Sequence, residues 1–452
     1  MYSARLRVAL VVCSAVLFAA FSKDAAANTL CVKPGGSQWC YAKIQWAVNA
    51  ASNNDVINVA PGTYKEDVVI GKPLSLIGAE GDPSVIDATN LANGIFVDGF
   101  DHPGLNNVTI AGFTVKNALF EGILVVNASD VIIRDNEIVD NDKSPGLLFT
   151  GKAEGCPGQP AFETDETGDC GGAVHLIGVA HSILSGNSLS GNADGLLISD
   201  ETAESRDNLV VHNVFKNNPL ECGIVLASHP PIGHTAPPFA AHYGVDRNTI
   251  SENVSTGNGV QVGGAGVGLF SDGNGQGRVS ANVIIRNELT GNGLTGVALH
   301  THVGPAFGLP PDDMSGNMII GNFIARNLAD FDDTKTPGTT GININSGGGG
   351  SPVYGTIISG NVIREEEVDI AVNTPAEVDI HLNDLLGGQI GVANVCALDN
   401  GASCAASRID ATENFWGCAG GPGKHGCSTI SGPDIRFTPW LKNRVDRDHD
   451  HD

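Results

Sequence analysis

The sequence has 452 residues, of which 6% are aromatic and 17% are charged, and it contains 59 glycines. Few charges and many glycines are typical of short strands and tight turns, and they argue against a helical protein. The formal net charge of −25 at pH 7 argues against nucleic acid and bare polyanions as partners, because an acidic surface repels them.

Residues 1–27 have the pattern of a secretory signal peptide. Arg5 and Arg7 supply positive charge, an apolar run extends over 8–21, and small residues at 25–27 offer a cleavage site. The run is shorter than the ~20 residues that a membrane-spanning helix needs, so a membrane anchor is the weaker alternative. We therefore expect a secreted or periplasmic protein without a transmembrane segment.

Residues 28–92 are predicted to form an N-terminal cap followed by the first strands. Apolar residues at helical spacing in 42–51 indicate a short helix, and the alternation in 56–60 is typical of a strand. A helix over the open end of a stack of strands would keep the first strand from pairing with another chain.

A set of residues in this cap carries a family resemblance. The set comprises Ile44, Gln45, Ala47, Val48, Ala51, Asp55, Ile57, and Val59 to Tyr64. These residues resemble the N-terminal part of pectin-lyase-like right-handed parallel β-helices, and with the repeats described next the resemblance extends from residue 30 to about 440. It implies the fold. That superfamily contains lyases, glycosidases, epimerases, adhesins and metal-delivery proteins, so the resemblance implies no single function.

One short phrase recurs along the chain: glycine, an apolar residue, any residue, a second apolar residue, any residue and a small polar residue. Its four central copies begin at Gly195, Gly223, Gly266 and Gly296. The alternation predicts a strand in each copy, and repetition at roughly 20–50 residues predicts a repeat architecture. Residues 93–395 are therefore predicted to form the coils of an all-β, single-stranded parallel β-helix with three sheets, right-handed according to the resemblance.

One coil leaves two alternatives for its register. If it begins at Gly172, His175 points into the core. If it begins at Ala173, Val174 and Leu176 point inwards and His175 points out. We favour the second register, because an unpaired buried histidine would be costly.

Asparagines recur at two equivalent places in the coils. The first set comprises Asn136, Asn187, Asn213, Asn253, Asn287, Asn322 and Asn361. The second set comprises Asn117, Asn141, Asn192, Asn218, Asn258, Asn292 and Asn327. Stacked side-chain amides hydrogen-bond one another along the axis of such a solenoid, and asparagine tolerates left-handed turns. We therefore expect internal ladders, and a row that binds a glycan or another ligand is the alternative.

The cysteines outside 1–27 form local couples. These are Cys31 with Cys40, Cys156 with Cys170, Cys396 with Cys404, and Cys418 with Cys427. They predict disulfides formed outside the cytoplasm, and zinc binding is an alternative that no CxxC spacing supports. Cys222 is left over and is predicted to be a buried thiol.

Two segments complete the chain. Residues 396–445 contain Asn414 to Gly417 and resemble the closing turns of secreted bacterial β-helices. Residues 446–452 form a charged tail that is predicted to be disordered, with weak metal binding as the alternative.

The strongest functional candidate is the set of residues that close the four central copies of the phrase. Neighbouring coils stack about 4.8 Å apart, so these residues would form one column on an outer face. We predict catalytic roles for Glu201, His229, Asp272, His302 and the adjoining His300. We predict substrate-binding roles for Phe270, Asp200 and Asn345.

Three chemistries fit this column. Glu201 and Asp272 lie two coils apart, which suits the ~6.5–9.5 Å carboxyl separation of an inverting glycosidase. His229, Asp272 and His302 would bind a divalent metal ion as two histidines and a carboxylate, and such an ion is the candidate cofactor. Alternatively, a histidine would be the general base of a lyase or epimerase.

The sequence thus predicts a protein that binds polysaccharide on the face of the 195–302 coils, with cleavage or modification as an open alternative. Competing predictions are a non-catalytic envelope or adhesin-type β-helix, a periplasmic metal-handling β-helix, and a column that is only a solvated face. The glycan, the bond and the oligomeric state are left open by the sequence.

Overall fold

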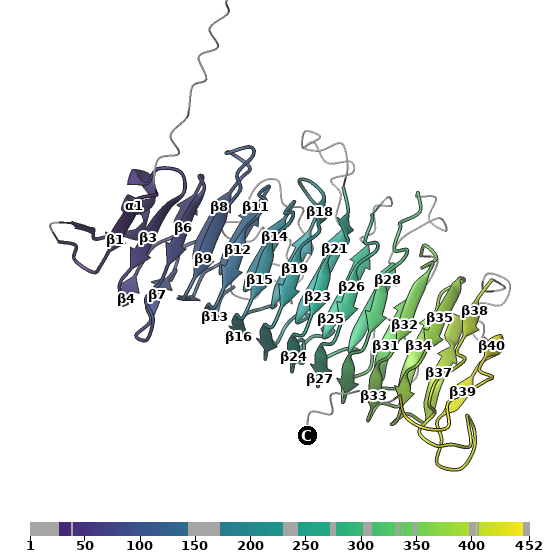
Figure 1. Ribbon diagram of the computed structural model, residues 1–452. Coiled ribbons are helices and arrows are strands. Elements are labelled where there is room, and N and C mark those ends of the chain that lie inside the picture. Colours follow the sequence, from purple (N-terminus) through teal and green to yellow (C-terminus); the bar gives the residue numbers. More distant parts are fainter. Residues whose placement is uncertain are drawn as a thin grey trace, which may run out of the picture.

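The computed structural model describes residues 27–142, 172–228, 243–271, 277–301, 310–346, 350–396, 404 and 406–445, except Gln38, Phe331, Asp332, Thr334 and Pro337. Over these residues the chain winds as a solenoid, with parallel strands stacked along one axis from α1 (Ile44–Ala50) at the N-terminal end to the last coil (Figure 1). The predicted all-β parallel β-helix with three sheets is confirmed. We name the three long sheets A, B and C.

Sheet A contains β1 (Thr29–Val32), β2 (Cys40–Tyr41), β3 (Asp55–Val59), β6 (Leu74–Ile77), β9 (Val108–Ala111), β12 (Ile132–Arg134), β15 (Ile183–Ser185), β19 (Leu209–Val211), β23 (Thr249–Ser251), β26 (Val283–Ile285), β29 (Met318–Ile320), β32 (Thr356–Ser359), β35 (Glu377–His381), β38 (Arg408–Asp410) and β40 (Ile435–Arg436).

Sheet B contains β4 (Gly62–Tyr64), β7 (Ser84–Asp87), β10 (Phe113–Lys116), β13 (Glu137–Val139), β16 (Ser188–Ser190), β20 (Val214–Lys216), β24 (Val254–Thr256), β27 (Glu288–Thr290), β30 (Phe323–Ala325), β33 (Val362–Arg364) and β36 (Asp384–Leu385). A small additional pair is formed by β18 (Ser205–Arg206) and β22 (Val245–Asp246).

Sheet C contains β5 (Val68–Ile70), β8 (Ile95–Asp98), β11 (Ile123–Val126), β14 (Val174–Ile177), β17 (Leu196–Ser199), β21 (Ile224–Ser228), β25 (Val267–Ser271), β28 (Val297–Thr301), β31 (Thr340–Asn345), β34 (Val368–Asn373), β37 (Ile390–Asn394) and β39 (Thr429–Ser431). The recurring glycine phrase therefore builds sheet C.

Alternate residues of each strand fill the interior of the coils. In β17 the side chains of Leu196 and Ile198 are fully buried, and they lie beside Ile224 and Leu226 of β21 in parallel register. The glycine that opens the phrase is required by close approach. A Cβ at Gly195 would lie 2.1 Å from the carbonyl oxygen of the next coil's glycine, a distance that no side chain tolerates.

The coil with two alternative registers adopts the favoured one. Val174 and Leu176 lie beside Leu196 and Ile198 and belong to the core. His175 points out of the coil as expected, but it is only 1% exposed. The outer side of sheet C is covered at this point, and the histidine has polar partners there that offset its burial.

The predicted asparagine ladders are confirmed, and a third exists that the sequence analysis missed. In each ladder the side-chain Nδ2 and the backbone N–H of one asparagine donate to Oδ1 of the asparagine on the next coil. The first ladder runs through Asn136, Asn187, Asn213, Asn253, Asn287, Asn322, Asn361, Asn383 and Asn414. The second runs through Asn141, Asn192, Asn218, Asn258, Asn292 and Asn327 and then reaches Glu366. The third runs through Asn208, Asn248, Asn282 and Asn317.

One predicted ladder member is wrong. Asn117 donates to Asp87 Oδ1 at 3.0 Å and is not part of the second ladder. The backbone N–H of Ala118 donates to Asn141 Oδ1, so the ladder position on this coil belongs to Ala118, one residue later. Asn117 instead has a left-handed backbone with φ of 63°, which is the other role that asparagine suits.

The predicted cap helix is α1, which buries Ile44, Ala47 and Val48 against the first coil. Its first backbone amides would lack partners inside the helix. Glu66 supplies them, because its two carboxylate oxygens accept from the N–H groups of Ile44 at 2.9 Å and Gln45 at 3.0 Å.

Three of the predicted disulfides are present: Cys31–Cys40, Cys396–Cys404 and Cys418–Cys427. Cys156 and Cys170 lie outside the described residues. Cys222 is buried as predicted, and its sulfur accepts the backbone N–H of Ala265 at 3.0 Å. No helix within the described ranges is long and apolar enough to cross a membrane.

Candidate functional site on the outer face of sheet C

The predicted column lies on sheet C, but only part of it falls within the described residues. His229, Asp272 and His302 lie outside them, so their roles stay predictions. The described members are Glu201, His300, Phe270, Asp200 and Asn345.

The outer face of sheet C is more enclosed than the sequence suggested. Glu201 is 1% exposed, His300 is 0% exposed and Asn345 is 5% exposed, while Phe270 is half-buried. The expectation of an open polar face is therefore wrong for these residues. The reason is that the segments entering the sheet fold over it: Cys222 and other turn residues pack on outward-facing strand residues to form a small apolar cluster. The cluster comprises Leu197, Cys222, Val225, Ala227, Ala265, Leu294 and Ala298, with Phe270 packed against it.

Asp200 has a structural environment that differs from the predicted substrate-binding one. It is 0% exposed, and its Oδ2 accepts the hydroxyl of Ser228 at 2.7 Å. The Ser228 hydroxyl oxygen in turn accepts the backbone N–H of Arg278 at 2.9 Å. Asp200 therefore links successive coils where sheet C ends, and its substrate-binding role stays a prediction.

Glu201 belongs to a buried chain of polar groups that the sequence analysis did not foresee. Glu121 Oε1 lies 3.0 Å from Nδ1 of His175, and Nε2 of His175 lies 2.8 Å from the Ser199 hydroxyl. Ser199 donates to Glu201 Oε2 at 2.5 Å. Serine has one hydroxyl hydrogen, which Ser199 donates to Glu201, so the Ser199 oxygen accepts from Nε2 of His175.

This polar network of Glu121, His175, Ser199 and Glu201 contains the carboxylate, imidazole and hydroxyl of a nucleophilic triad, but it does not work as one. The Ser199 hydrogen is already used by Glu201, and all four side chains are at most 1% exposed. A nucleophile must reach its substrate and pass its proton to the imidazole. The polar network therefore joins three coils of sheet C. No signal in the sequence indicated the network, because Glu121 and His175 are 54 residues apart.

His300 is the centre of a second polar cluster on the same face. Its Nε2 lies 2.9 Å from Oδ2 of Asp330, and its ring stands edge-on to Phe270 with centroids 5.6 Å apart. Asp330 also accepts Nδ2 of Asn343 at 3.0 Å. Asn345 accepts Nδ2 of Asn373 at 3.2 Å on the neighbouring coil. The structure thus brings together three predicted residues, His300, Phe270 and Asn345, and adds a carboxylate that orients the imidazole.

Asp330, the carboxylate beside His300, comes from the segment between β30 and β31. Asp333 from the same segment accepts the Thr336 hydroxyl at 2.6 Å and Nδ2 of Asn343 at 3.3 Å. A histidine close to a carboxylate is suited to general acid–base catalysis, because the nearby negative charge stabilises the protonated ring. Asp330 and Asp333 were not singled out by the sequence analysis.

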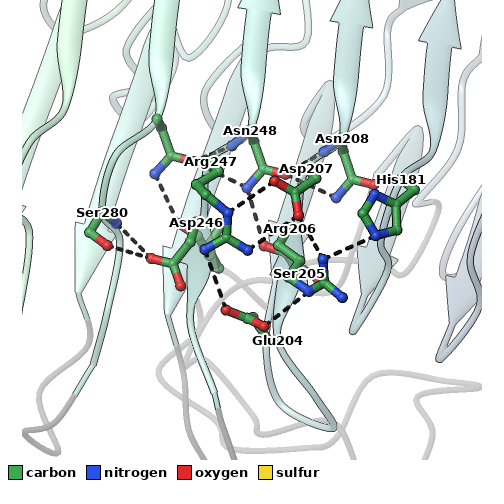
Figure 2. Close-up of polar contacts among 12 residues, drawn as sticks. His181, Glu204, Ser205, Arg206, Asp207, Asn208, Asp246, Arg247, Asn248 and Ser280 are labelled. Carbon is green, nitrogen blue, oxygen red and sulfur yellow. Dashed lines mark hydrogen bonds and ion pairs between the residues drawn. The ribbon is translucent and has the colours of Figure 1, made fainter.

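A charged network lies at the corner between sheets C and A (Figure 2). Arg206 Nε lies 3.1 Å from Glu204, and its Nη1 donates to Asp207 at 2.6 Å. Arg247 on the next coil donates to Asp207 at 3.0 Å, and Arg278 one coil further donates to Glu204 at 2.7 Å. The Arg247 hydrogen bond is the main cause that lowers the pKa of Asp207 below its usual value.

The Arg206 side chain points into this network (Figure 2). Its guanidinium is engaged by carboxylates on its own coil, so it is positioned to stabilise the corner and not to abstract a proton from a substrate. Among the described residues, one group of three side chains is placed to hold a metal ion, and it lies on sheet A, not in the predicted column.

These features define a class: a right-handed parallel β-helix with a partly enclosed, polar and aromatic outer face on one sheet. Residues 89–235 match the family described as right handed beta helix region. This match covers about a third of the chain, and the described coils beyond it share the same parallel β-helix fold. No curated protein matches the chain.

Solved structures share the fold at low sequence identity. The catalytic domain of a GH87 alpha-1,3-glucanase in complex with tetrasaccharides has a TM-score of 0.53 and 12% identity, covering 92% of this chain and 69% of that one. ORF18 of Geobacillus virus E2 has a TM-score of 0.49 and 12% identity, covering 74% of this chain and 57% of that one. The A-module of the Azotobacter vinelandii mannuronan C-5 epimerase AlgE4 has a TM-score of 0.45 and 12% identity, covering 88% and 94%. This chain thus spans 57% of the length of the viral protein.

Proposed function

We propose that the protein acts on polysaccharide outside the cytoplasm and that the glycan lies on the outer face of sheet C beside Phe270 and His300. The observation that carries the proposal is the His300–Asp330 pair, in which imidazole Nε2 lies 2.9 Å from a carboxylate oxygen, next to a half-buried aromatic ring. Pockets for small organic ligands commonly combine apolar walls with a few convergent polar groups, and the apolar cluster that packs against Phe270 would border this site.

Two further observations support this proposal. The glucanase catalytic domain that shares the fold is described in complex with tetrasaccharides, so a β-helix of this kind is able to hold a glycan. Disulfides such as Cys31–Cys40 persist in oxidising compartments, which supports a location outside the cytoplasm. His229, Asp272 and His302 follow β21, β25 and β28 in the chain, and we propose that they complete the site around His300.

The chemistry that we propose is proton transfer by His300. Its side chain is 0% exposed in this structure, so a sugar would reach it only after the residues that cover it move aside. Asp330 would hold the ring so that one nitrogen is directed at the reacting sugar, and Phe270 would support the sugar ring. A glycosidase would instead need two carboxyl groups facing the bond, and Glu201 of the predicted pair already accepts the hydroxyl of Ser199. We therefore favour a lyase or epimerase over an inverting glycosidase.

The test is a panel of polysaccharides incubated with purified protein, read out as new reducing ends and as absorbance at 235 nm from unsaturated products. A lyase gives both signals, a hydrolase gives reducing ends alone, and an epimerase gives neither but changes the sugar composition of the polymer.

Asp330→Asn keeps the shape of the carboxylate and removes its charge. It should lower turnover by roughly 10²–10⁴-fold, the usual contribution of a positioned acid or base. His212→Gln is the matched control, because His212 is an exposed histidine that also contacts a carboxylate. Full activity in Asp330→Asn, or no binding of any glycan by the parent protein, would refute the proposal.

Asp272→Asn tests the part of the site that stays a prediction. If a divalent metal ion is bound there, this variant should lose activity and a chelator should reproduce the loss in the parent protein. If the group acts through its charge on a histidine, the chelator should have no effect while activity still falls. Parent-like activity in Asp272→Asn would remove it from the site.

A further inference from the structure

The outer face of sheet A carries an arrangement near its C-terminal end that no step of the proposed function uses. Asp379 and His381 are two residues apart on β35 and therefore point to the same side of the sheet. Asp410 on β38 is the parallel partner of Asp379 on the next coil. All three side chains are partly exposed, at 48%, 29% and 14% for Asp379, His381 and Asp410.

The hydrogen bonds of His381 decide which ring nitrogen faces the carboxylates. Nδ1 lies 2.9 Å from the backbone carbonyl oxygen of Thr412. A carbonyl oxygen only accepts, so Nδ1 carries the hydrogen and the neutral ring presents its lone pair at Nε2. Metal-binding histidines are commonly oriented in this way, with the second nitrogen donating to a carbonyl or carboxylate.

The spacing around Nε2 is too wide for hydrogen bonds and close to that of a coordination shell. Nε2 lies 4.0 Å from Asp379 Oδ1 and 3.9 Å from Asp410 Oδ2. Ligand atoms of a tetrahedral site with bonds of ~2.1 Å are about 3.4 Å apart. A shift of about half an ångström would bring Nε2 to this spacing from both oxygens. The three ligand atoms all lie within 4.8 Å of one another, and side-chain rotation of these partly exposed groups would close the remaining gap.

Electrostatics also favours a cation at this place. Asp379 and Asp410 are directly opposite on adjacent strands, and like charges in that position destabilise a sheet. Arg436 on β40 contacts Asp410 Oδ2 and neutralises that carboxylate, but it lies on the far side of Asp410 from Asp379. A divalent ion between the two carboxylates would remove the repulsion, and it would have to displace the 69% exposed Arg436 from Asp410.

We propose that Asp379, His381 and Asp410 form a binding site for a divalent transition metal ion of the zinc type. One nitrogen and two oxygens leave at least one position open for water, which suits Zn²⁺. Arg436 competes with the ion for Asp410. Without metal the Arg436 guanidinium pairs with Asp410, and a bound metal ion would displace it.

The experiment is a calorimetric titration of Zn²⁺ into the full chain in which His449 and His451 are replaced by Gln and Asp272 by Asn, because the tail histidines and the predicted column would bind metal on their own. This background should bind one Zn²⁺. Asp379→Asn and His381→Gln should each weaken the affinity about tenfold or more, a loss of the size seen when a metal site is disturbed. His212→Gln is the matched control and should bind as the background does.

Arg436→Ala makes the sharper prediction. This variant removes a side chain whose contact with the proposed ligand atoms is limited to Asp410 Oδ2. If Arg436 only stabilised the sheet, zinc affinity would be unchanged, whereas competition between Arg436 and the ion predicts tighter zinc binding. Zinc should also raise the melting temperature of the background protein, and it should leave the melting temperature of the same protein carrying His381→Gln unchanged. The proposal is overturned if the background binds no Zn²⁺, if Asp379→Asn and His381→Gln bind it unchanged, or if Arg436→Ala binds it more weakly.

Discussion

Replacing Glu366 by Gln is expected to stabilise the protein above neutral pH and to change little at pH 4.5. Glu366 occupies the place where the second asparagine ladder would continue, and its Oε1 accepts both the backbone N–H of Asn327 at 2.8 Å and Nδ2 at 3.1 Å. The side-chain oxygen of Gln is able to accept the same two hydrogen bonds. The substitution therefore removes the ionisable group while keeping the ladder.

The carboxyl group of Glu366 is close to a second buried carboxyl group. Asp369 stands where the other copies of the phrase have glycine, and its side chain is 0% exposed. Burial, and then the nearby Glu366, raises the pKa of Asp369 well above its usual value. Burial is also the main cause that raises the pKa of Glu366 from 4.5 to about 7.

The direction of the effect follows from proton binding. Between pH 4.5 and about 7 the folded protein holds a proton on Glu366 that the unfolded chain has already released. The stability that this proton confers is fully present below pH 4.5 and is lost as pH rises through the folded-state pKa. A difference of about 2.5 pKa units at ~1.36 kcal/mol per unit corresponds to about 3 kcal/mol.

The assay is urea unfolding of the parent and Glu366→Gln at pH values from 4.5 to 8. The difference in the free energy of unfolding should grow with pH towards about 3 kcal/mol above pH 7. Asp369→Gly, which restores the glycine of the other coils, should also flatten the pH dependence. Glu365→Gln is the control, because this neighbouring carboxylate is 50% exposed and is the smallest of the causes that shift the pKa of Glu366, so it should change the curve far less. Parallel curves for the parent and Glu366→Gln would refute the reasoning.

Two further predictions concern the coils themselves. Asn213→Ala and Asn287→Ala should each lower the free energy of unfolding by roughly 1–3 kcal/mol, because each leaves buried backbone groups such as Leu184 O without a donor, and unchanged melting of both would contradict the ladder. Gly195→Ala should destabilise by about 1–3 kcal/mol through its clash with a backbone oxygen at 2.1 Å. Gly291→Ala, which meets nothing within 4 Å and bears only the strain of its φ of 66°, should cost less in the same melting experiment, and an equal cost would contradict the close-packing argument.

The sequence by itself determined the repeating coil. Each copy of the phrase, such as 195–200, places its apolar residues at a spacing of two, and that spacing alone decides which side chains fill the interior. The asparagines that follow at fixed offsets predicted two ladders, because equivalent positions on successive coils stack. Cys396–Cys404 and the other confirmed disulfides join residues close in sequence, so their partners were evident without the fold.

Only the tertiary structure decided what lies on the outer faces. Glu121 meets His175, His300 meets Asp330, and Asp379 meets Asp410 across coils of different length. The spacing in sequence varies because each turn between sheets has its own length, whereas the strand pattern repeats. Turn residues such as Cys222 also cover sheet C and bury groups that a bare strand pattern would leave in solvent. The sequence pattern fixes which way a side chain points, but the other coils and turns decide what that side chain meets.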